Sequence, residues 1–183
     1  TLFPYTTLFR SARLESSKAF AKQFMVKSGV PTAEYTEFTD FAAFQKFLKK
    51  NKKRIVLKKS GLAAGKGVLD TAARDEMLVF AERTLRDDTL VAEEFLDGYE
   101  TSIFAVCDGQ NYILMPPCMD FKKAGEGDTG PNTGGLGSVC PVPWLDAAIQ
   151  RRILTEIVEP TFAGLRAGGL MYKGVVYFGL MIT

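Results

Sequence analysis

The stretch Ile55-Val-Leu-Lys-Lys-Ser-Gly-Leu-Ala-Ala-Gly-Lys-Gly67 joins an apolar run to a loop of small residues. The run predicts a buried strand ending near Lys58, and Val68-Leu69 predicts a second strand after the loop. Small residues let backbone N–H groups approach an anion without interference from a Cβ atom. The sequence therefore predicts a phosphate-binding loop between two strands, with contacts from Lys58, Gly61, Gly65, Lys66 and Gly67.

This loop does not fit the Walker A pattern, in which Gly-x-x-x-x-Gly-Lys is followed by Ser or Thr and then a helix. Here Lys66 is followed by Gly67 and a strand-like pair. Taken alone, the loop also fits a flexible Gly/Ala turn with two solvated lysines. Its neighbours in the sequence favour the phosphate site.

The composition is that of an ordinary globular protein, with 183 residues, a net charge of +2 and 46% hydrophobic residues. No apolar stretch approaches the roughly 20 residues of a membrane span. The basic run 49–54 has no interleaved aromatic residues, which a single-stranded nucleic-acid groove would need. We therefore expect neither a membrane nor a nucleic acid as a partner.

Histidine is absent, which excludes Ser-His and Cys-His nucleophiles and histidine-ligated metals. The three cysteines, Cys107, Cys118 and Cys140, form no Cys-x-x-Cys pair and are odd in number. Neither a zinc site nor a full disulfide framework is indicated. The expected location is a reducing cytoplasm.

Helical and strand patterns alternate along the chain. Caps at Ser16 or Ser17 and at Asp40 begin two helices, and the Asp108-Gly109 pair predicts a two-residue hairpin turn. The glycine-rich stretch 120–143 predicts a long functional loop. Further helices are expected over 74–85 and from about Trp144 onward, and Pro160 is expected to bend or interrupt the second of these. Further strands are expected at 90–96, 99–106, 112–115 and 174–182.

Three segments are expected. Residues 1–11 fit nothing that follows and read as translated adapter sequence or a disordered tail, so they are excluded from fold reasoning. Residues 12–96 form an α+β unit around the phosphate loop, and residues 97–183 form a second unit. The last strand stops at Thr183 without a turn, and we therefore expect a fragment of a longer protein.

Several motifs occur in one order: Lys18 at a helix start, Lys58 at a strand end, Glu-Glu-Phe-Leu-Asp-Gly at 93–98 and Gly-Asp-Thr-Gly-Pro-Asn-Thr-Gly-Gly at 127–135. With the loop at 61–67, they make the chain from Ala12 to Thr183 resemble the ATP-grasp domain of the phosphoribosylamine-glycine ligase family of purine biosynthesis. The resemblance implies an α+β ATP-grasp fold in which ATP lies between two α+β subdomains.

The resemblance also implies residue roles. Lys18 and Lys58 match the lysines that hold phosphates, and the loop from Gly61 to Gly67 matches the flexible loop that closes over them. An edge strand would bind adenine through the Glu94 carbonyl and the Leu96 N–H, while Glu100 would bind the ribose. The matching strand residues are Glu93, Glu94, Phe95 and Leu96. Singly, each has an ordinary explanation, such as a surface lysine or a core phenylalanine.

The implied activity is an ATP-dependent carbon–nitrogen ligase. Glycine would attack the γ-phosphate to give glycyl phosphate, and 5-phosphoribosylamine would then attack to give glycinamide ribonucleotide, ADP and phosphate. Positioning and charge stabilisation by lysines and Mg²⁺ or Mn²⁺ would suffice, without a side-chain nucleophile. Asp120, Lys122 and Asn132 would face the substrates, and the metal ligands are expected beyond Thr183.

The chain departs from the family pattern in the short link 86–89, in its stop at Thr183 and in the segment 119–123. Where the family has Gln-Asp-His-Lys-Arg, this chain has Met119-Asp120-Phe121-Lys122-Lys123, which loses an arginine fork. Two alternatives therefore stay open: another ATP-grasp carboxylate-amine ligase, and a non-catalytic nucleotide-binding module. The complete loop at 127–135 argues against the first, and absence of the expected Glu and Asn after Thr183 would favour the second. The isolated chain is expected to lack ligase activity.

Overall fold

The computed structural model describes residues 11–63, 67–127 and 129–183. The chain divides into two compact units, the first ending at Phe95 and the second spanning Leu96–Thr183. Within the described ranges, no helix has both the length and the apolar character needed to cross a membrane.

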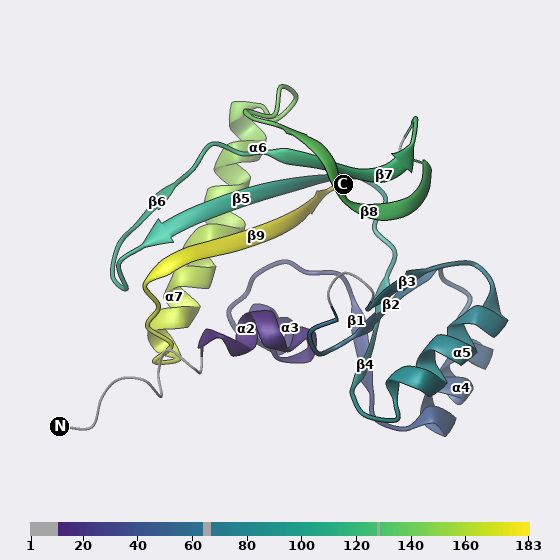
Figure 1. Ribbon diagram of the computed structural model, residues 1–183. Coiled ribbons are helices and arrows are strands. Elements are labelled where there is room, and N and C mark those ends of the chain that lie inside the picture. Colours follow the sequence, from purple (N-terminus) through teal and green to yellow (C-terminus); the bar gives the residue numbers. More distant parts are fainter. Residues whose placement is uncertain (1–10, 64–66, 128) are drawn as a thin grey trace. The chain divides into compact units, whose positions relative to one another are not determined.

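The first unit is built on a four-stranded antiparallel sheet with the order β1-β4-β2-β3. Helices α4 and α5 lie on one side of this sheet and α3 lies on the other (Figure 1). The elements are α2 (Arg13–Ser16), α3 (Lys18–Lys27), β1 (Tyr35–Phe38), α4 (Phe41–Lys50), β2 (Ile55–Lys59), β3 (Val68–Asp70), α5 (Arg74–Thr84) and β4 (Leu90–Glu94).

Alternation along the strands separates an apolar from a polar face of this sheet. Leu57 pairs with Ala92, and both side chains join the core beneath α4 and α5. Val56 pairs with Glu93 on the opposite face, which also carries Lys58. The core cluster consists of Phe38, Phe44, Leu48, Ile55, Leu57, Met77, Ala81, Leu90 and Ala92. The polar side chains therefore face α3.

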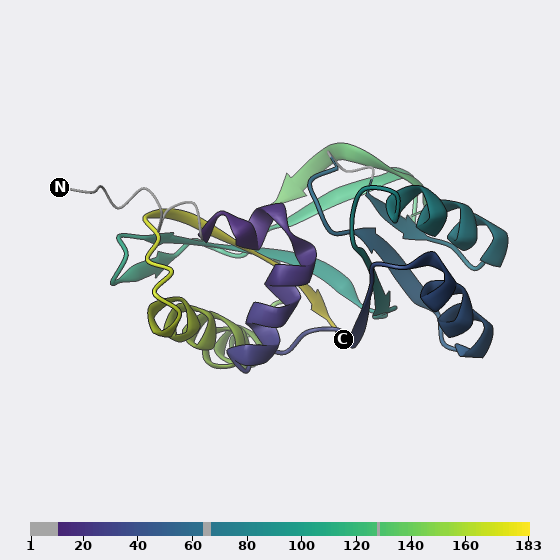
Figure 2. The same ribbon diagram turned by 90° about the horizontal axis from the view of Figure 1, so that it is seen from below.

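The second unit contains a three-stranded sheet, β6-β5-β9, and a separate hairpin, β7-β8. A continuous helical segment, α6-η1-α7, covers one face of the larger sheet (Figure 2), where Phe162 stacks on Tyr112. The elements are β5 (Tyr99–Cys107), β6 (Tyr112–Leu114), β7 (Met119–Gly125), β8 (Thr129–Val139), α6 (Ala147–Arg152), η1 (Ile153–Val158), α7 (Glu159–Ala167) and β9 (Gly174–Ile182).

The last helix passes through Pro160 without ending. Proline has no N–H to donate to the carbonyl four residues earlier, so the regular ladder cannot continue there. The structure accommodates this by a π-helical turn, η1, directly before α7, which has Pro160 in its first turn. The predicted interruption is therefore a local change of helix type.

The prediction of a long loop over 120–143 is wrong, because β7 and β8 pair in an antiparallel hairpin. The pairing is irregular, with register shifts between Phe121 and Lys123 and between Lys123 and Gly125. Gly127 and Gly130 adopt φ angles of 65° and 81°, which ordinary side chains disfavour. Glycines that predicted a loop thus permit a tight turn and bulges within a sheet.

The predicted two-residue turn at Asp108-Gly109 is also wrong. Cys107 pairs with Tyr112, so the turn has four residues, Asp108–Asn111. The Asp108 carboxylate accepts hydrogen bonds from the Gln110 and Asn111 N–H groups at 2.8 and 2.7 Å. A side-chain acceptor therefore stabilises the longer turn.

Candidate functional site

Lys18 is the first residue of α3, as predicted, and this helix start is attached to the end of β2. Ser17 caps the helix by accepting from the Phe20 N–H, which excludes the alternative cap at Ser16. Ser60 accepts from the Ala19 N–H, and its carbonyl accepts from the Lys18 N–H at 2.9 Å. Serine contacts therefore bring the positive end of a helix to the glycine loop.

The Lys18 side chain reaches the same loop. Its ammonium donates to the Gly61 carbonyl at 3.3 Å. Burial lowers the pKa of Lys18, and the positive charge of Lys58 lowers it further, against attraction from Asp88 and Glu93. The two ammonium groups are thus close enough to repel each other, and an anion between them would relieve this repulsion.

Lys58 lies near the end of β2 and pairs with the carboxylate of Glu93. The Lys58 Nζ lies 2.8 Å from Glu93 Oε2, and Lys22 Nζ lies 3.2 Å from that same oxygen. Glu93 and Lys22 are 8% and 7% exposed, whereas Lys58 is 29% exposed. Of these three groups, Lys58 is therefore the one available to a ligand.

The start of the glycine loop is held by Asp88. The Gly61 N–H donates to Asp88 Oδ2 at 2.8 Å, and the Thr89 N–H donates to the other oxygen. At the far end, the Gly67 carbonyl accepts from the Lys59 N–H at 2.8 Å. Both ends are thus anchored, while the predicted contacts Gly65 and Lys66 lie outside the described residues.

The predicted adenine-binding edge lies at the end of β4. The Phe95 N–H donates to the Arg54 carbonyl, and the Arg54 guanidinium lies 3.5 Å from the centre of the Phe95 ring. Glu94 Oε1 accepts from the Glu34 N–H at 2.9 Å. Among the residues placed by the structure, none accepts a hydrogen bond from the Leu96 N–H. This donor is therefore open to a ligand.

In the second unit, Glu100, Asp120 and Lys122 form a polar cluster. Lys122 Nζ lies 2.7 Å from Glu100 Oε2 and 3.6 Å from Asp120 Oδ2. Burial acts to lower the pKa of Lys122, but its hydrogen bond to Glu100 and both negative charges outweigh burial and raise the pKa. Asn132 stands on β8 opposite Lys123 in the strand register. Three of the predicted site residues, Glu100, Asp120 and Lys122, therefore lie close together. The fourth, Asn132, lies on β8, the strand that pairs with β7.

The described ranges contain no group of three or more Cys, Asp or Glu side chains that could hold a metal ion. The nearest carboxylates are already used: Glu93 pairs with two lysines, and Asp88 accepts two backbone hydrogen bonds. These residues do not fit a Mg²⁺ site. The cysteines are free thiols.

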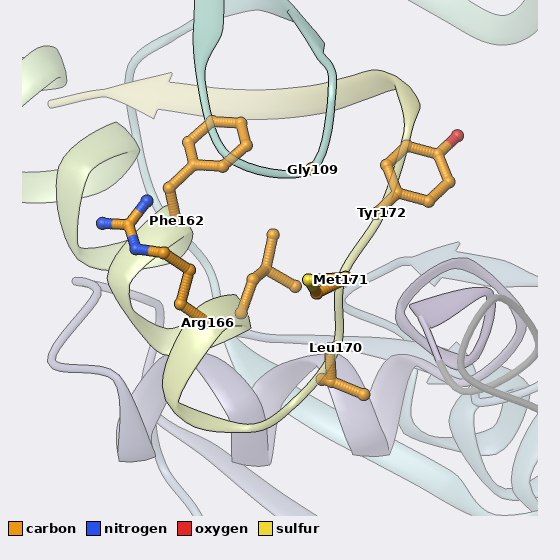
Figure 3. Close-up of a pocket in the computed structure, with 7 residues that line it drawn as sticks. Gly109, Phe162, Arg166, Leu170, Met171 and Tyr172 are labelled. Carbon is orange, nitrogen blue, oxygen red and sulfur yellow. The ribbon is translucent and has the colours of Figure 1, made fainter. Parts of the chain in front are cut away.

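A small cavity of about 10 Å³ lies in the second unit and contains none of the predicted site residues. Figure 3 shows Phe162 and Tyr172 on either side of the turn that carries Gly109. Leu165, Arg166, Leu170 and Met171 complete the lining. This volume is sufficient for about one water molecule. The cavity is therefore a packing defect between helix and sheet, too small for a nucleotide.

Sequence reasoning missed three residues at the lysine site: Lys22, Ser60 and Asp88. Lys22 follows Lys18 by four residues, so a helical pattern places both on one face, and this signal was available. Ser60 directly follows the strand lysines, but a serine at a strand end is common. Asp88 lies in a short acidic turn, and only the folded chain brings its carboxylate to Gly61.

Comparison with known proteins agrees with this architecture. A family described as "Phosphoribosylglycinamide synthetase, ATP-grasp (A) domain" matches residues 16–183. The phosphoribosylamine–glycine ligase of Chlorobaculum tepidum is 47% identical over 180 residues, covering 94% of this chain and 42% of the relative. The chain thus spans less than half the length of this relative.

Solved structures show the same fold. The crystal structure of the phosphoribosylamine–glycine ligase from Thermotoga maritima has a TM-score of 0.84 and 36% identity, covering 94% of this chain and 45% of that chain. An Aspergillus clavatus carboxyaminoimidazole ribonucleotide synthase complexed with ATP has a TM-score of 0.72 at 19% identity, covering 94% and 42%, respectively. The predicted α+β ATP-grasp fold is confirmed. The chain belongs to the family of phosphoribosylglycinamide synthetase ATP-grasp (A) domains.

Proposed function

We propose that this chain binds ATP and forms the ATP-binding part of a phosphoribosylamine–glycine ligase. The observation that carries the proposal is the convergence of Lys18 and Lys58 beside the anchored turn at Gly61. Relatives with this name support glycine and 5-phosphoribosylamine as the substrates. The products would be glycinamide ribonucleotide, ADP and phosphate.

Phosphoryl transfer suits these residues because it requires positioning and charge stabilisation more than covalent participation by the protein. The Lys18 and Lys58 ammonium groups would hold the phosphates and stabilise negative charge during attack by the glycine carboxylate. The N–H groups of a glycine loop can approach a phosphate closely. Loop residues Gly65, Lys66 and Gly67 stay in this proposed role, whereas Gly61, whose N–H donates to Asp88, would hold the start of the loop.

The adenine and ribose contacts are proposed at the end of β4 and the start of β5. The open Leu96 N–H would donate to the base and the Glu94 carbonyl would accept from it. Glu93 is not proposed as a base contact, because its carboxylate is buried between two lysines. Glu100 shares one carboxylate oxygen with Lys122, and its second oxygen would accept from the ribose.

The acceptor side is assigned to Asp120, Lys122 and Asn132. A carboxylate such as that of Asp120 can orient the amino group of phosphoribosylamine, and the ammonium of Lys122 can attract the glycine carboxylate. The pKa of Lys122 is raised by its neighbours, so the group keeps its charge at neutral pH. The amine would then attack glycyl phosphate without a protein nucleophile.

The first test is a calorimetric titration of the chain with Mg-ATP. Replacing Lys58 with alanine is expected to weaken binding about tenfold or more, because one charge-assisted phosphate contact is lost. Lys46→Ala is the matched control, since Lys46 is an exposed lysine of α4. Equal affinities of folded wild type and Lys58→Ala would contradict the assigned phosphate site.

The second test addresses the substrates. Residues 16–183 would replace the matching segment of the Chlorobaculum tepidum relative, and ADP release would be measured. We expect release that requires both glycine and phosphoribosylamine. Release with another carboxylate and without glycine would favour a different ATP-grasp ligase. Nucleotide binding by the chain with no release from a folded chimera would favour a non-catalytic module.

A further inference from the structure

Lys22 is a buried residue of α3, although sequence reasoning assigns it no role. Its side chain is only 7% exposed. Its ammonium donates to Thr32 Oγ1 at 2.8 Å and to the Ala33 carbonyl at 3.3 Å, and it lies 3.2 Å from Glu93 Oε2. An ammonium group has three donors, and three protein acceptors use them here. Lys22 is therefore fully engaged inside the protein and has no donor left for a ligand.

Glu93 Oε2 is shared between this buried lysine and Lys58, which lies 2.8 Å away. The cluster therefore contains two positive charges and one negative charge. If Lys22 were neutral, the charge of Glu93 would be balanced by Lys58 alone, and the pair would attract a phosphate weakly. With Lys22 present, the cluster keeps a net positive charge, and the more exposed Lys58 presents it.

Keeping a charged lysine at this position has a cost. Burial lowers the pKa of Lys22, and Lys58 lowers it further, while the charge and hydrogen bond of Glu93 and the charge of Glu94 act against them. The Tyr35 ring, 5.5 Å from the ammonium, also faces it. The buried charge is maintained against this cost by its pairing with Glu93 and by its hydrogen bonds to Thr32 and Ala33.

We propose that Lys22 is a positioning residue for phosphate binding: it compensates the charge of Glu93, so that the Lys58 ammonium, paired with Glu93, presents the net positive charge of the cluster to the nucleotide. This inference rests on the proposed function. It assigns Lys22 no contact with ATP. The effect of Lys22 on binding should therefore depend on whether residue 93 carries a charge.

A double-mutant cycle tests this dependence. Mg-ATP is titrated into the wild-type chain, Lys22→Met, Glu93→Gln and the double variant, at physiological salt to screen distant charges. We expect Lys22→Met alone to weaken binding about tenfold. In the Glu93→Gln background, the same change is expected to alter binding by less than about threefold, because no negative charge then competes for Lys58.

Two further variants separate charge from packing. Lys22→Arg retains the positive charge and is expected to bind Mg-ATP within about threefold of the wild type. Lys53→Met removes one charge from an exposed pair with Glu34 in the same unit and is expected to leave binding unchanged. Circular dichroism and thermal unfolding establish that each titrated variant is folded.

The outcomes are distinguishable. Failure of the folded wild type to bind Mg-ATP would overturn the proposed function and this inference together. Binding that depends on Lys58 but not on Lys22 would overturn the inference alone. An equal loss from Lys22→Met with and without the Glu93 charge would also overturn it, because that result would indicate a packing effect.

If Glu93→Gln does not fold, Glu93→Ala takes its place in the cycle. If neither variant folds, the proposal is tested by comparing the Mg-ATP affinities of Lys22→Met and Lys22→Arg. Weakened binding by the methionine variant with normal binding by the arginine variant supports the charge role. Equal binding by these two variants overturns it.

Discussion

Gly61 and Asp88 are in direct contact: the Gly61 N–H donates to Asp88 Oδ2 at 2.8 Å. A Cβ atom added at Gly61 would lie 2.6 Å from the same oxygen. The carboxylate therefore occupies the space that a side chain at residue 61 would need. This contact ties the start of the glycine loop to the turn before β4.

Replacing Gly61 with alanine is therefore expected to displace the Asp88 carboxylate and break this hydrogen bond. Bonds to charged groups contribute about 1.5–3 kcal/mol, so the free energy of unfolding should fall by about that amount. Urea unfolding measures the change. Gly137→Ala is the control, because nothing lies within 4 Å of its added Cβ and its φ is not positive. Equal stabilities of these variants would contradict the prediction.

Lys18→Met is expected to weaken ATP binding while preserving or increasing stability. Burial and the charge of Lys58 lower the pKa of Lys18, so the charged form is disfavoured in the folded state. Removing the charge relieves this cost but also removes a phosphate contact. Calorimetry and urea unfolding on one preparation measure both effects. A folded variant with unchanged ATP affinity would exclude Lys18 from the site.

The same pKa shift predicts a pH dependence. Between the lowered folded pKa and the ordinary lysine pKa of 10.5, the unfolded state binds more protons than the folded state. The contribution of Lys18 to the free energy of unfolding of the wild type therefore rises as pH increases through that range. The stability advantage of Lys18→Met should shrink accordingly. Urea unfolding at pH 7 and at pH values approaching 10.5 tests this, and a constant advantage would contradict the shift.

Asp108 predicts a pH dependence of the same sign in the acid range, because its folded pKa is also lowered. Hydrogen bonds from the Asn111 and Gln110 N–H groups hold its pKa below the ordinary aspartate value of 3.8. The folded carboxylate thus contributes stability that is present above 3.8 and lost as pH falls through the folded pKa. The wild type should exceed Asp108→Asn in stability at pH 7, with the difference decreasing in acid. Unfolding curves with no such pH trend would contradict the hydrogen bonds assigned to the Asp108 carboxylate in this turn.

Truncating a side chain on the apolar face of the first sheet should reduce stability more than truncating an exposed side chain of α5. Leu57 is fully buried beneath α4 and α5, so Leu57→Ala is expected to cost about 2–5 kcal/mol through lost contacts and a cavity. Val79 is 68% exposed on α5, and Val79→Ala should change stability by less than about 0.5 kcal/mol. Comparable losses from the two variants would contradict the assigned core.

Most secondary structure was predictable because its signals are local. Asp40 caps α4 as expected, and the apolar runs became β2 and β4. β1 was missed because a four-residue strand carries little periodic signal. The β7-β8 hairpin was missed because its glycines indicate loops, whereas their positive φ angles here serve turns and bulges.

The sequence by itself determined the order of elements, the small residues of the phosphate loop and the motifs shared with the family. These properties depend on residue type and on spacing along the chain. Only the tertiary structure decided that Glu93 lies between Lys22 and Lys58 and that Asp88 reaches Gly61. The physical reason is that burial and charge sharing depend on distances between side chains from separate elements, and these distances exist only when α3 packs on the sheet.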